Sequence, residues 1–129
     1  MVHSPPLIAV VDDDAPLRTA LGRLLRTSGY EVKGFGCAEE FLAARDALAP
    51  DCLVLDLHMP GMSGFDVQQR LVTRGLALPV VVITGQDSPV ARSRAVAGGA
   101  CAYLCKPLDK DALIGAIEGA LKRTAAKRQ

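Results

Sequence analysis

The sequence lacks tryptophan, and aromatic residues make up only 4% of it, although 50% of its residues are hydrophobic. We therefore expect an interior built mainly from Val, Leu, Ile and Ala side chains. An excess of charge of either sign is also missing, because the formal net charge is +1. A domain with so balanced a charge gives no reason to expect binding to nucleic acid or to a membrane surface.

Long hydrophobic runs are absent as well. The longest apolar run near the N-terminus covers residues 7–11, and acidic residues follow it at once. Such a run is too short for a membrane span or a signal peptide, so we expect a cytoplasmic protein. A chain of 129 residues is long enough for one ordinary domain with a substantial core.

The four cysteines form no CxxC pattern. Cys101 and Cys105 are expected in one strand, where about 13 Å would separate their Cα atoms, too far for a disulfide. Cys37 and Cys52 lie far apart in the sequence. We interpret all four as small buried hydrophobic residues, not as metal ligands or disulfide partners.

Short apolar runs alternate with segments of helical periodicity. Strands are predicted at residues 7–11, 30–34, 52–55, 79–84 and 101–105, and helices at residues 15–28, 38–47, 64–74, 89–97 and 110–121. Continuous apolar strands separated by helices are typical of a parallel sheet covered on both faces. We predict an α/β domain over residues 1–123, with five parallel strands in the order 2-1-3-4-5 and helices on both faces. Residues 124–129 are expected to form a tail or the start of a linker.

Three adjacent carboxylates, Asp12 to Asp14, follow the first apolar run. Two anions about 4 Å apart repel each other by on the order of 4 kcal/mol near a protein surface. In this strand order, strands 1 and 3 are neighbours at the point where ligands bind, and the third strand ends in Asp56. A hard divalent cation removes the repulsion, and Mg²⁺ accepts carboxylate, water and phosphate oxygens. We therefore predict that these acids form a Mg²⁺ site, with Mn²⁺ as a substitute.

The ends of the fourth and fifth strands carry groups suited to phosphoryl chemistry. Thr84 offers a hydroxyl that can donate to a phosphoryl oxygen, and Lys106 offers a mobile positive charge. Gly85, beside Thr84, leaves room for a group to approach. Four strand ends with polar or ionic groups of complementary type together indicate a phosphoryl site.

Taken singly, these residues also have purely structural interpretations. Asp12 or Asp14 can cap the helix that follows, and for Asp14 we favour this role. Thr84 can cap the next turn, and Lys106 can be a solvated strand end. Tyr103, near the end of the fifth strand, can be an ordinary aromatic at the boundary of the sheet.

Four segments resemble the receiver domain of two-component response regulators, and they read VVDDD, LVLDLHMPGMSGFD, VVVITG and GGACAYLCKPLD. The resemblance covers residues 7–121. The polar loop and Pro89 after VVVITG are most similar to the receivers of FixJ-type transcriptional regulators. The resemblance implies the flavodoxin-like receiver fold and a phosphorylation-activated switch in phosphorelay signalling, rather than an enzyme that turns over a substrate.

The resemblance also implies a role for each acidic residue. Asp56 would accept a phosphoryl group from a phosphohistidine. Asp13, Asp56 and the main-chain carbonyl of His58 would bind Mg²⁺ directly, and Asp12 would act chiefly through metal-bound water. Lys106 would pair with the phosphoryl oxygens.

The switch and its partners follow from the same resemblance. Thr84 would move to hydrogen-bond the phosphoryl group, and Tyr103 would swing inward as Thr84 withdraws. The peptide between Lys106 and Pro107 is expected to be cis. The donor would be a sensor histidine kinase or a phosphotransfer protein. The face of helix 4, strand 5 and helix 5 would then control an output partner or a DNA-binding domain, with homodimerisation on phosphorylation and no direct nucleic-acid contact by this domain.

Two positions in this pattern have no fixed role. His58 lies two residues after Asp56, and Gln86 lies two residues after Thr84. In the family such positions flank the path of the hydrolytic water, so both are candidates for tuning dephosphorylation. His58 would either position or exclude that water, or face outward with little effect.

Rival functions of the same fold class fit less well. A nucleotide hydrolase needs GxxxxGK[ST], which the sequence lacks. A phosphatase of the haloacid dehalogenase type needs a second acid where His58 stands, and a flavodoxin-like FMN carrier needs a first loop that binds phosphate rather than repelling it. The remaining alternative is a receiver-like binding module that works without phosphorylation.

Overall fold

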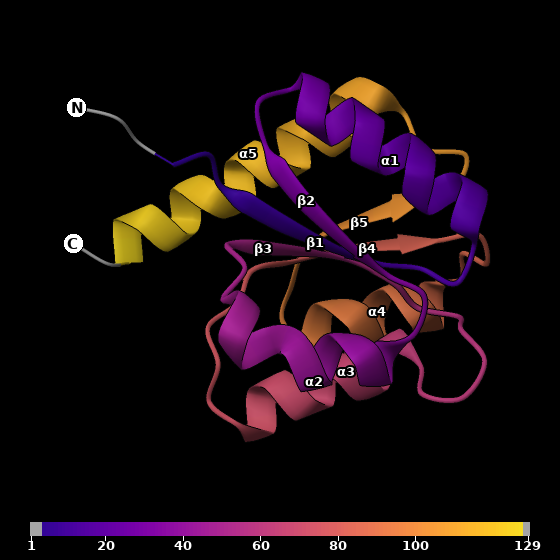
Figure 1. The fold of residues 1–129 in the computed structure, drawn as a ribbon. Helices are drawn as coiled ribbons and strands as arrows, with labels where there is room; N and C mark the ends of the chain where they lie inside the picture. The colour runs from indigo at the N-terminus through magenta and orange to yellow at the C-terminus, as the bar shows by residue number, and fades with distance from the viewer. Residues whose placement is uncertain (1–3, 128–129) are drawn as a thin grey trace.

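The structure is a computed structural model that describes residues 4–127, and the side chains of residues 4–123. Over these residues five strands alternate with five helices (Figure 1). The strands are β1 (Leu7–Val11), β2 (Glu31–Phe35), β3 (Cys52–Asp56), β4 (Val80–Thr84) and β5 (Ala100–Cys105). The helices are α1 (Ala15–Thr27), α2 (Ala38–Leu48), α3 (Gly64–Thr73), α4 (Pro89–Ala97) and α5 (Lys110–Lys127).

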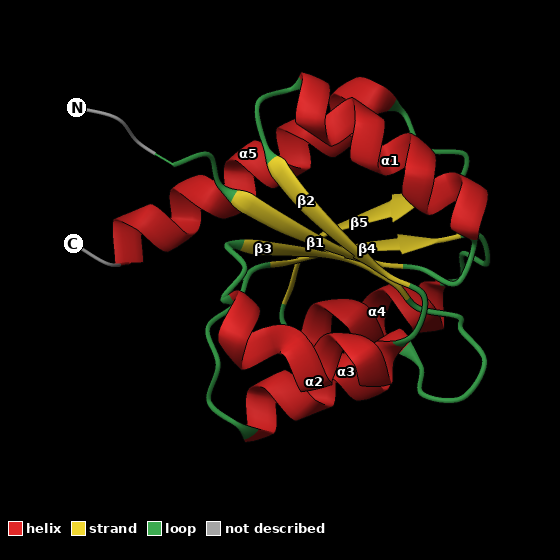
Figure 2. Cartoon of the chain, viewed as in Figure 1, coloured by secondary structure: helices red, strands yellow, loops and turns green. Residues whose placement is uncertain are grey.

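The sheet has the predicted topology. Its order is β2-β1-β3-β4-β5 and every neighbouring pair is parallel; Figure 2 shows the strands stacked between two layers of helices. Helices α1 and α5 cover one face, and α2, α3 and α4 cover the other. The α/β architecture with the order 2-1-3-4-5 is therefore confirmed.

Each face of the sheet has its own hydrophobic core, because successive residues of a strand point to opposite faces. In β1, Ile8 and Val10 pack with α1 and α5, whereas Ala9 and Val11 pack with α2, α3 and α4. Strands β3 and β4 are buried along their whole length. The cores consist mainly of aliphatic side chains, as expected for a sequence without tryptophan.

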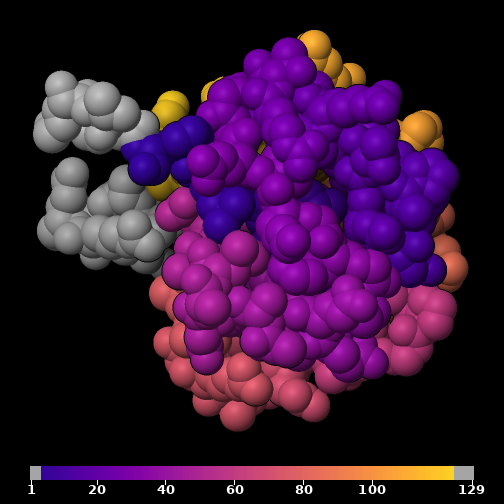
Figure 3. Space-filling model, viewed as in Figure 1, coloured from indigo at the N-terminus to yellow at the C-terminus, as the bar shows by residue number. Residues whose placement is uncertain are grey.

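The edge strand β2 is largely exposed, and together with α1 and α2 it forms much of the face seen in Figure 3. It begins one residue later than predicted, at Glu31, and includes Phe35. Tyr30 is excluded because its amide donates to the Leu25 carbonyl at 3.0 Å, which completes the end of α1. Phe35 is included because it pairs with Val11 and its carbonyl accepts from the Asp12 amide at 3.1 Å.

The loops at the carboxyl edge of the sheet lead into capped helices. The Asp14 side chain accepts a hydrogen bond from the Leu17 amide and caps α1, as favoured from the sequence. Ser63 and Asp66 form a capping box at the start of α3. The Ser88 side chain accepts a hydrogen bond from the Ala91 amide at 3.0 Å and caps α4. These caps satisfy amide groups that have no partner within their helices, and so fix where each helix begins.

Two expectations need adjustment. Helix α5 continues past residue 123 to Lys127, so the start of the expected tail is helical. The prediction of four buried cysteines is wrong: Cys52 is buried, but Cys37 and Cys101 are half-buried and Cys105 is exposed. Cys105 is the last residue of β5, where the strand leaves the core. All four thiols are free, as expected.

Within the described residues, no helix combines the length and the apolar character that crossing a membrane requires.

Candidate functional site

The predicted site residues meet at the carboxyl edge of the sheet. Asp12 follows β1, Asp56 ends β3, Thr84 ends β4 and Lys106 follows β5. The strand register aligns these ends, since Val11 pairs with Leu55 and Thr84 pairs with Cys105. Because the strands are parallel, four segments distant in sequence place their polar ends together. The structure thus brings these four residues into one site.

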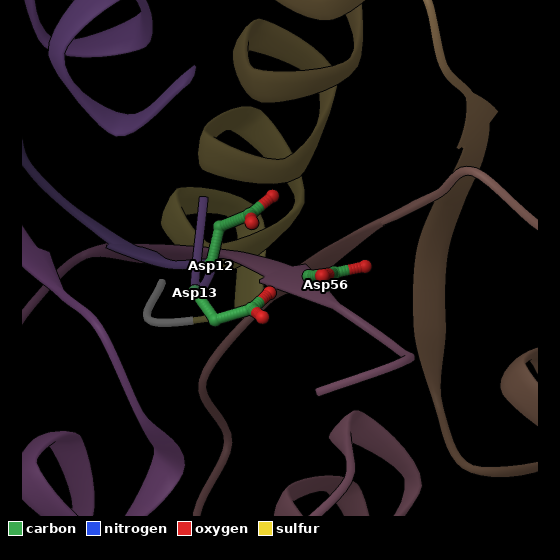
Figure 4. Close-up of side chains that lie close together, drawn as sticks. All are labelled: Asp12, Asp13 and Asp56. Carbon is green, nitrogen blue, oxygen red and sulfur yellow. The ribbon is translucent and has the colours of Figure 1, made fainter. Parts of the chain in front are cut away.

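Three carboxylates form the acidic part of this site. Oxygen atoms of Asp12, Asp13 and Asp56 lie within 4.8 Å of one another. Figure 4 shows Asp12 and Asp13 beside the end of β1 and Asp56 at the end of β3, with the three side chains close together. Asp12 and Asp56 are buried, and Asp13 is exposed. Two buried carboxylates and one open to solvent suit a hard cation that keeps part of its water shell.

Lys106 neutralises part of this negative charge. Its Nζ lies 2.9 Å from Oδ2 of Asp12 and 3.6 Å from Oδ2 of Asp56. Partial burial disfavours the ammonium form, but the contact with Asp12 and the charge of Asp56 outweigh that effect and raise the pKa of Lys106. The side chain therefore remains positively charged at neutral pH and can pair with further oxygen anions.

The Asp56 carboxyl is held in an unusual electrostatic environment. Burial raises its pKa to about 6, and the nearby Asp12 carboxylate adds to the rise. Lys106 and the amide of His58, which lies 3.4 Å from Oδ1, act in the opposite direction. Asp56 is still mainly ionised at neutral pH, and its ionised form is destabilised by its neighbours. A cation or a bond to an electrophile would relieve this destabilisation.

Thr84 is completely buried, and its hydroxyl has two partners. Oγ1 lies 3.1 Å from Nδ1 of His58 and 3.0 Å from the amide nitrogen of Gln86. The side chains at both positions left open by the sequence are exposed. His58 nevertheless touches Thr84 directly, whereas Gln86 does so only through its main chain.

The remaining predicted residues lie around these groups. Gly85 is exposed, and an added Cβ would lie 3.8 Å from Cδ of Lys106, so the glycine keeps the space above the lysine open. The bond between Lys106 and Pro107 is cis, as expected. The Tyr103 ring is half-buried and lies beneath the Arg92 guanidinium, 4.6 Å from it. Burial of the Tyr103 hydroxyl raises its pKa, and the Asp87 carboxylate adds to this rise.

Two arginines with a part in the site were missed from the sequence. Arg18 in α1 donates to the carbonyl of Asp12 at 2.7 Å and fixes the main chain that carries the acids. It passes Gly34 and Gly36, and an added Cβ at Gly36 would lie 3.3 Å from its Nη1. These two glycines, one in β2 and one directly after it, were the sequence signal that a long side chain passes over this strand. Nothing in the sequence indicated the contact between Arg92 and Tyr103.

Known proteins are similar to this chain both in sequence and in fold. The family of the response regulator receiver domain matches residues 8–118. The response regulator protein TmoT of Ectopseudomonas mendocina is 40% identical over 124 residues, which cover 95% of this chain and 56% of that protein. The structure of response regulator StyR has a TM-score of 0.89 at 42% identity, covering 97% of this chain and 63% of that one. The FixJ-N crystal structure has a TM-score of 0.85 at 34% identity, covering 95% of this chain and 96% of that one.

The chain belongs to the response regulator receiver domain family. It is accordingly a signalling domain of the two-component type, a switch activated by phosphorylation. Its relatives include the FixJ transcriptional regulators, as the sequence resemblance indicated. The chain spans about half the length of the curated relatives it matches.

Proposed function

We propose that Asp56 is the phosphoryl acceptor of this receiver domain. The observation that carries the proposal is the position of a buried carboxylate, at the end of β3, between two further acids and the Lys106 ammonium group 3.6 Å away. In the reaction an Asp56 oxygen attacks the phosphorus of a phosphohistidine. A P–O bond forms, the P–N bond breaks, and the imidazole leaves with its electron pair and takes up a proton.

The side chains around Asp56 supply the binding and the charge neutralisation. Asp13, Asp56 and the main-chain carbonyl of His58 would hold Mg²⁺ or Mn²⁺, with Asp12 acting through bound water. A bound Mg²⁺ would offset the charge of the transferring oxygens. Lys106, already placed against Asp12 and Asp56, would contact a phosphoryl oxygen, and Gly85 leaves the approach open. The domain positions these groups and does not turn over a substrate of its own.

The donor is proposed to be a cytoplasmic sensor histidine kinase or phosphotransfer protein, which places the chain in the cytoplasm. Phosphorylation adds negative charge and acceptor oxygens at Asp56. Thr84 would then turn toward the phosphoryl group and Tyr103 would move inward, changing the surface of α4, β5 and α5. This surface would act on an output partner or a DNA-binding domain and would not itself contact nucleic acid. Gln86 and His58 would tune the lifetime of the phosphoryl group.

A second copy of the chain is a further proposed partner of the phosphorylated form. Val90 and Val96 on α4 are 76% and 58% exposed, which leaves apolar area on the surface that would change. Sedimentation or light scattering with and without phosphorylation tests this. A molar mass that stays that of one chain in both states would contradict it.

The test of the acceptor uses intact mass after incubation with Mg²⁺ and acetyl phosphate. One phosphoryl adduct is expected on the wild-type chain and none on Asp56→Asn. Asp46→Asn, an exposed change on α2, should keep the adduct and serves as the control. A wild-type chain without an adduct would favour a binding module that works without phosphorylation, and an adduct on Asp56→Asn would place the acceptor elsewhere.

A further inference from the structure

The hydrogen bonds of the Thr84 hydroxyl can be assigned from its two partners. Thr84 is 0% exposed, so water does not reach its hydroxyl. The amide of Gln86, 3.0 Å away, can only donate, and it therefore occupies one lone pair of Oγ1. The other contact joins Oγ1 to Nδ1 of His58 at 3.1 Å. A ring nitrogen can donate or accept, so the direction of this second bond follows from where the hydroxyl proton can go.

The hydroxyl proton has one good acceptor. If Nδ1 donated to Oγ1, the oxygen would accept two hydrogen bonds, and its own proton would have no acceptor among the residues that the structure describes. A buried donor without a partner costs stability. If Nδ1 accepts instead, the hydroxyl proton and the Gln86 amide proton are both paired. The Thr84 proton is therefore directed to Nδ1 of His58, with the ring proton on Nε2 of this exposed residue.

Packing on its other side keeps the His58 ring in this orientation. The ring forms a T-shaped pair with Phe65 in the first turn of α3, with 6.3 Å between the ring centroids and 89° between the planes. The Arg94 guanidinium covers Phe65 at 4.1 Å. The main chain of His58 is also fixed, because its amide points at Oδ1 of Asp56. His58 thus connects the acceptor carboxylate with the hydroxyl that would sense its phosphorylation.

We propose that His58 is a positioning residue that holds the Thr84 hydroxyl proton in the unphosphorylated protein and competes for it with the phosphoryl group on Asp56. This inference rests on the proposed function, in which Thr84 donates to a phosphoryl oxygen. A hydroxyl has one proton, so Thr84 has to leave His58 before it can bind the phosphoryl group. The bond to His58 therefore stabilises the inactive arrangement and weakens every ligand that needs Thr84 in the active one.

This role differs from control of the hydrolytic water. The bond to His58 shifts the equilibrium between the inactive and active arrangements of Thr84, whereas control of water changes the rate of dephosphorylation. Beryllofluoride, which binds to an aspartate carboxylate as a stable phosphoryl mimic, separates the two. No hydrolysis takes place in its complex, so a residue that only guides water does not change its affinity. A residue that restrains Thr84 does change it.

The experiment measures the affinity for beryllofluoride at saturating Mg²⁺ by isothermal titration calorimetry. His58→Phe keeps a ring against Phe65 and removes the acceptor, and it should bind about fivefold more tightly than wild type, the ratio expected for one net hydrogen bond. His58→Asn offers an amide oxygen near the place of Nδ1 and should restore the wild-type affinity. In a Thr84→Val background the change at residue 58 should have no effect.

Each failure has its own meaning. A wild-type chain that binds no beryllofluoride, with Asp56→Asn as the blank, would remove the proposed function itself. Binding to wild type with an unchanged or weaker affinity in His58→Phe would overturn the restraint and leave the acceptor role intact. An equal gain in beryllofluoride affinity from His58→Phe in the Thr84→Val background would also overturn the restraint and leave the acceptor role intact. If circular dichroism shows His58→Phe to be unfolded, His58→Ala is measured against the same criteria.

Discussion

At the scale of the residue, the surroundings of Asp56 lower the stability of the fold, although they suit the proposed role of this carboxylate as a phosphoryl acceptor. Its carboxyl group has a pKa of about 6 instead of 3.8, because burial and Asp12 disfavour the charge more than Lys106 favours it. In the unfolded chain the carboxyl group ionises near its ordinary value. Without a metal ion the folded protein is therefore penalised for ionising Asp56, and the penalty develops as the pH rises from about 4 to above 6.

Asp56→Asn removes this penalty and should stabilise the metal-free protein. The gain in the free energy of unfolding should be on the order of 1 to 3 kcal/mol at about pH 7.5 and should fall toward zero below about pH 4, as the wild-type carboxyl, already neutral in the folded protein, becomes neutral in the unfolded chain as well. Urea unfolding in EDTA across this pH range measures it. A gain that does not change with pH would show that the charge of Asp56 is not its origin.

The residues at the strand ends could be predicted to form one site from the sequence, but the contacts between their side chains could not. Asp12, Asp56, Thr84 and Lys106 could be predicted because parallel strands end at one edge, whatever the side-chain geometry. The bond between His58 and Thr84 could not, because it depends on the path of two loops and on the rotamer of an exposed ring. Arg92 over Tyr103 is a similar case, since it joins α4 to β5 across space.

At the scale of the element, the start of α3 is packed against the site itself. A Cβ at Gly64 would lie 2.5 Å from the carbonyl oxygen of Asp56 and 2.9 Å from Cα of Leu57, both main-chain atoms. The Gly64 amide also donates to the Leu57 carbonyl at 3.0 Å. The helix can begin this close to β3 only because residue 64 has no side chain.

Gly64→Ala should therefore displace either α3 or the strand end. We expect a loss of about 1 to 3 kcal/mol in the free energy of unfolding, as for other overpacking substitutions, and slower phosphorylation of Asp56. Gly115→Ala in α5 is the matched control, because a Cβ there meets nothing within 4 Å. That substitution should stabilise the protein by roughly 0.5 to 1 kcal/mol. A Gly64→Ala protein as stable as wild type would show that the loop yields freely.

Element boundaries were predictable where burial was strong and less so where it was weak. The runs of β1, β3 and β4 are buried on both faces, and their predicted bounds agree with the structure to within one residue. Edge strand β2 exposes most of its residues, so its apolar pattern is short, and its predicted start and end were both one residue early. Helix α5 continues beyond its apolar face, where periodicity gives no signal for its end.

At the scale of the whole molecule, the sheet topology forces like charges together, so a cation bound among them would couple its binding to folding. A ligand that binds only the folded state stabilises it by RT ln(1 + [L]/Kd), about 2.7 kcal/mol at a concentration of 100 Kd. The carboxylates of Asp12, Asp13 and Asp56 come together only when β1 and β3 are neighbours. In the unfolded chain Asp12 and Asp56 are separated by more than forty positions, so the acids do not form a site.

Mg²⁺ should therefore raise the midpoint of thermal unfolding in a concentration-dependent way, and EDTA should reverse the effect. Asp13→Asn tests the origin of this stabilisation. Asp13 is exposed, has no ion pair among the described residues and repels the other two acids, so without metal the variant should be at least as stable as wild type, and it should gain much less from Mg²⁺. NaCl at the same ionic strength controls for screening. Equal stabilisation of both proteins by Mg²⁺, or equal effects of NaCl and Mg²⁺, would mean that the ion does not act through the three carboxylates.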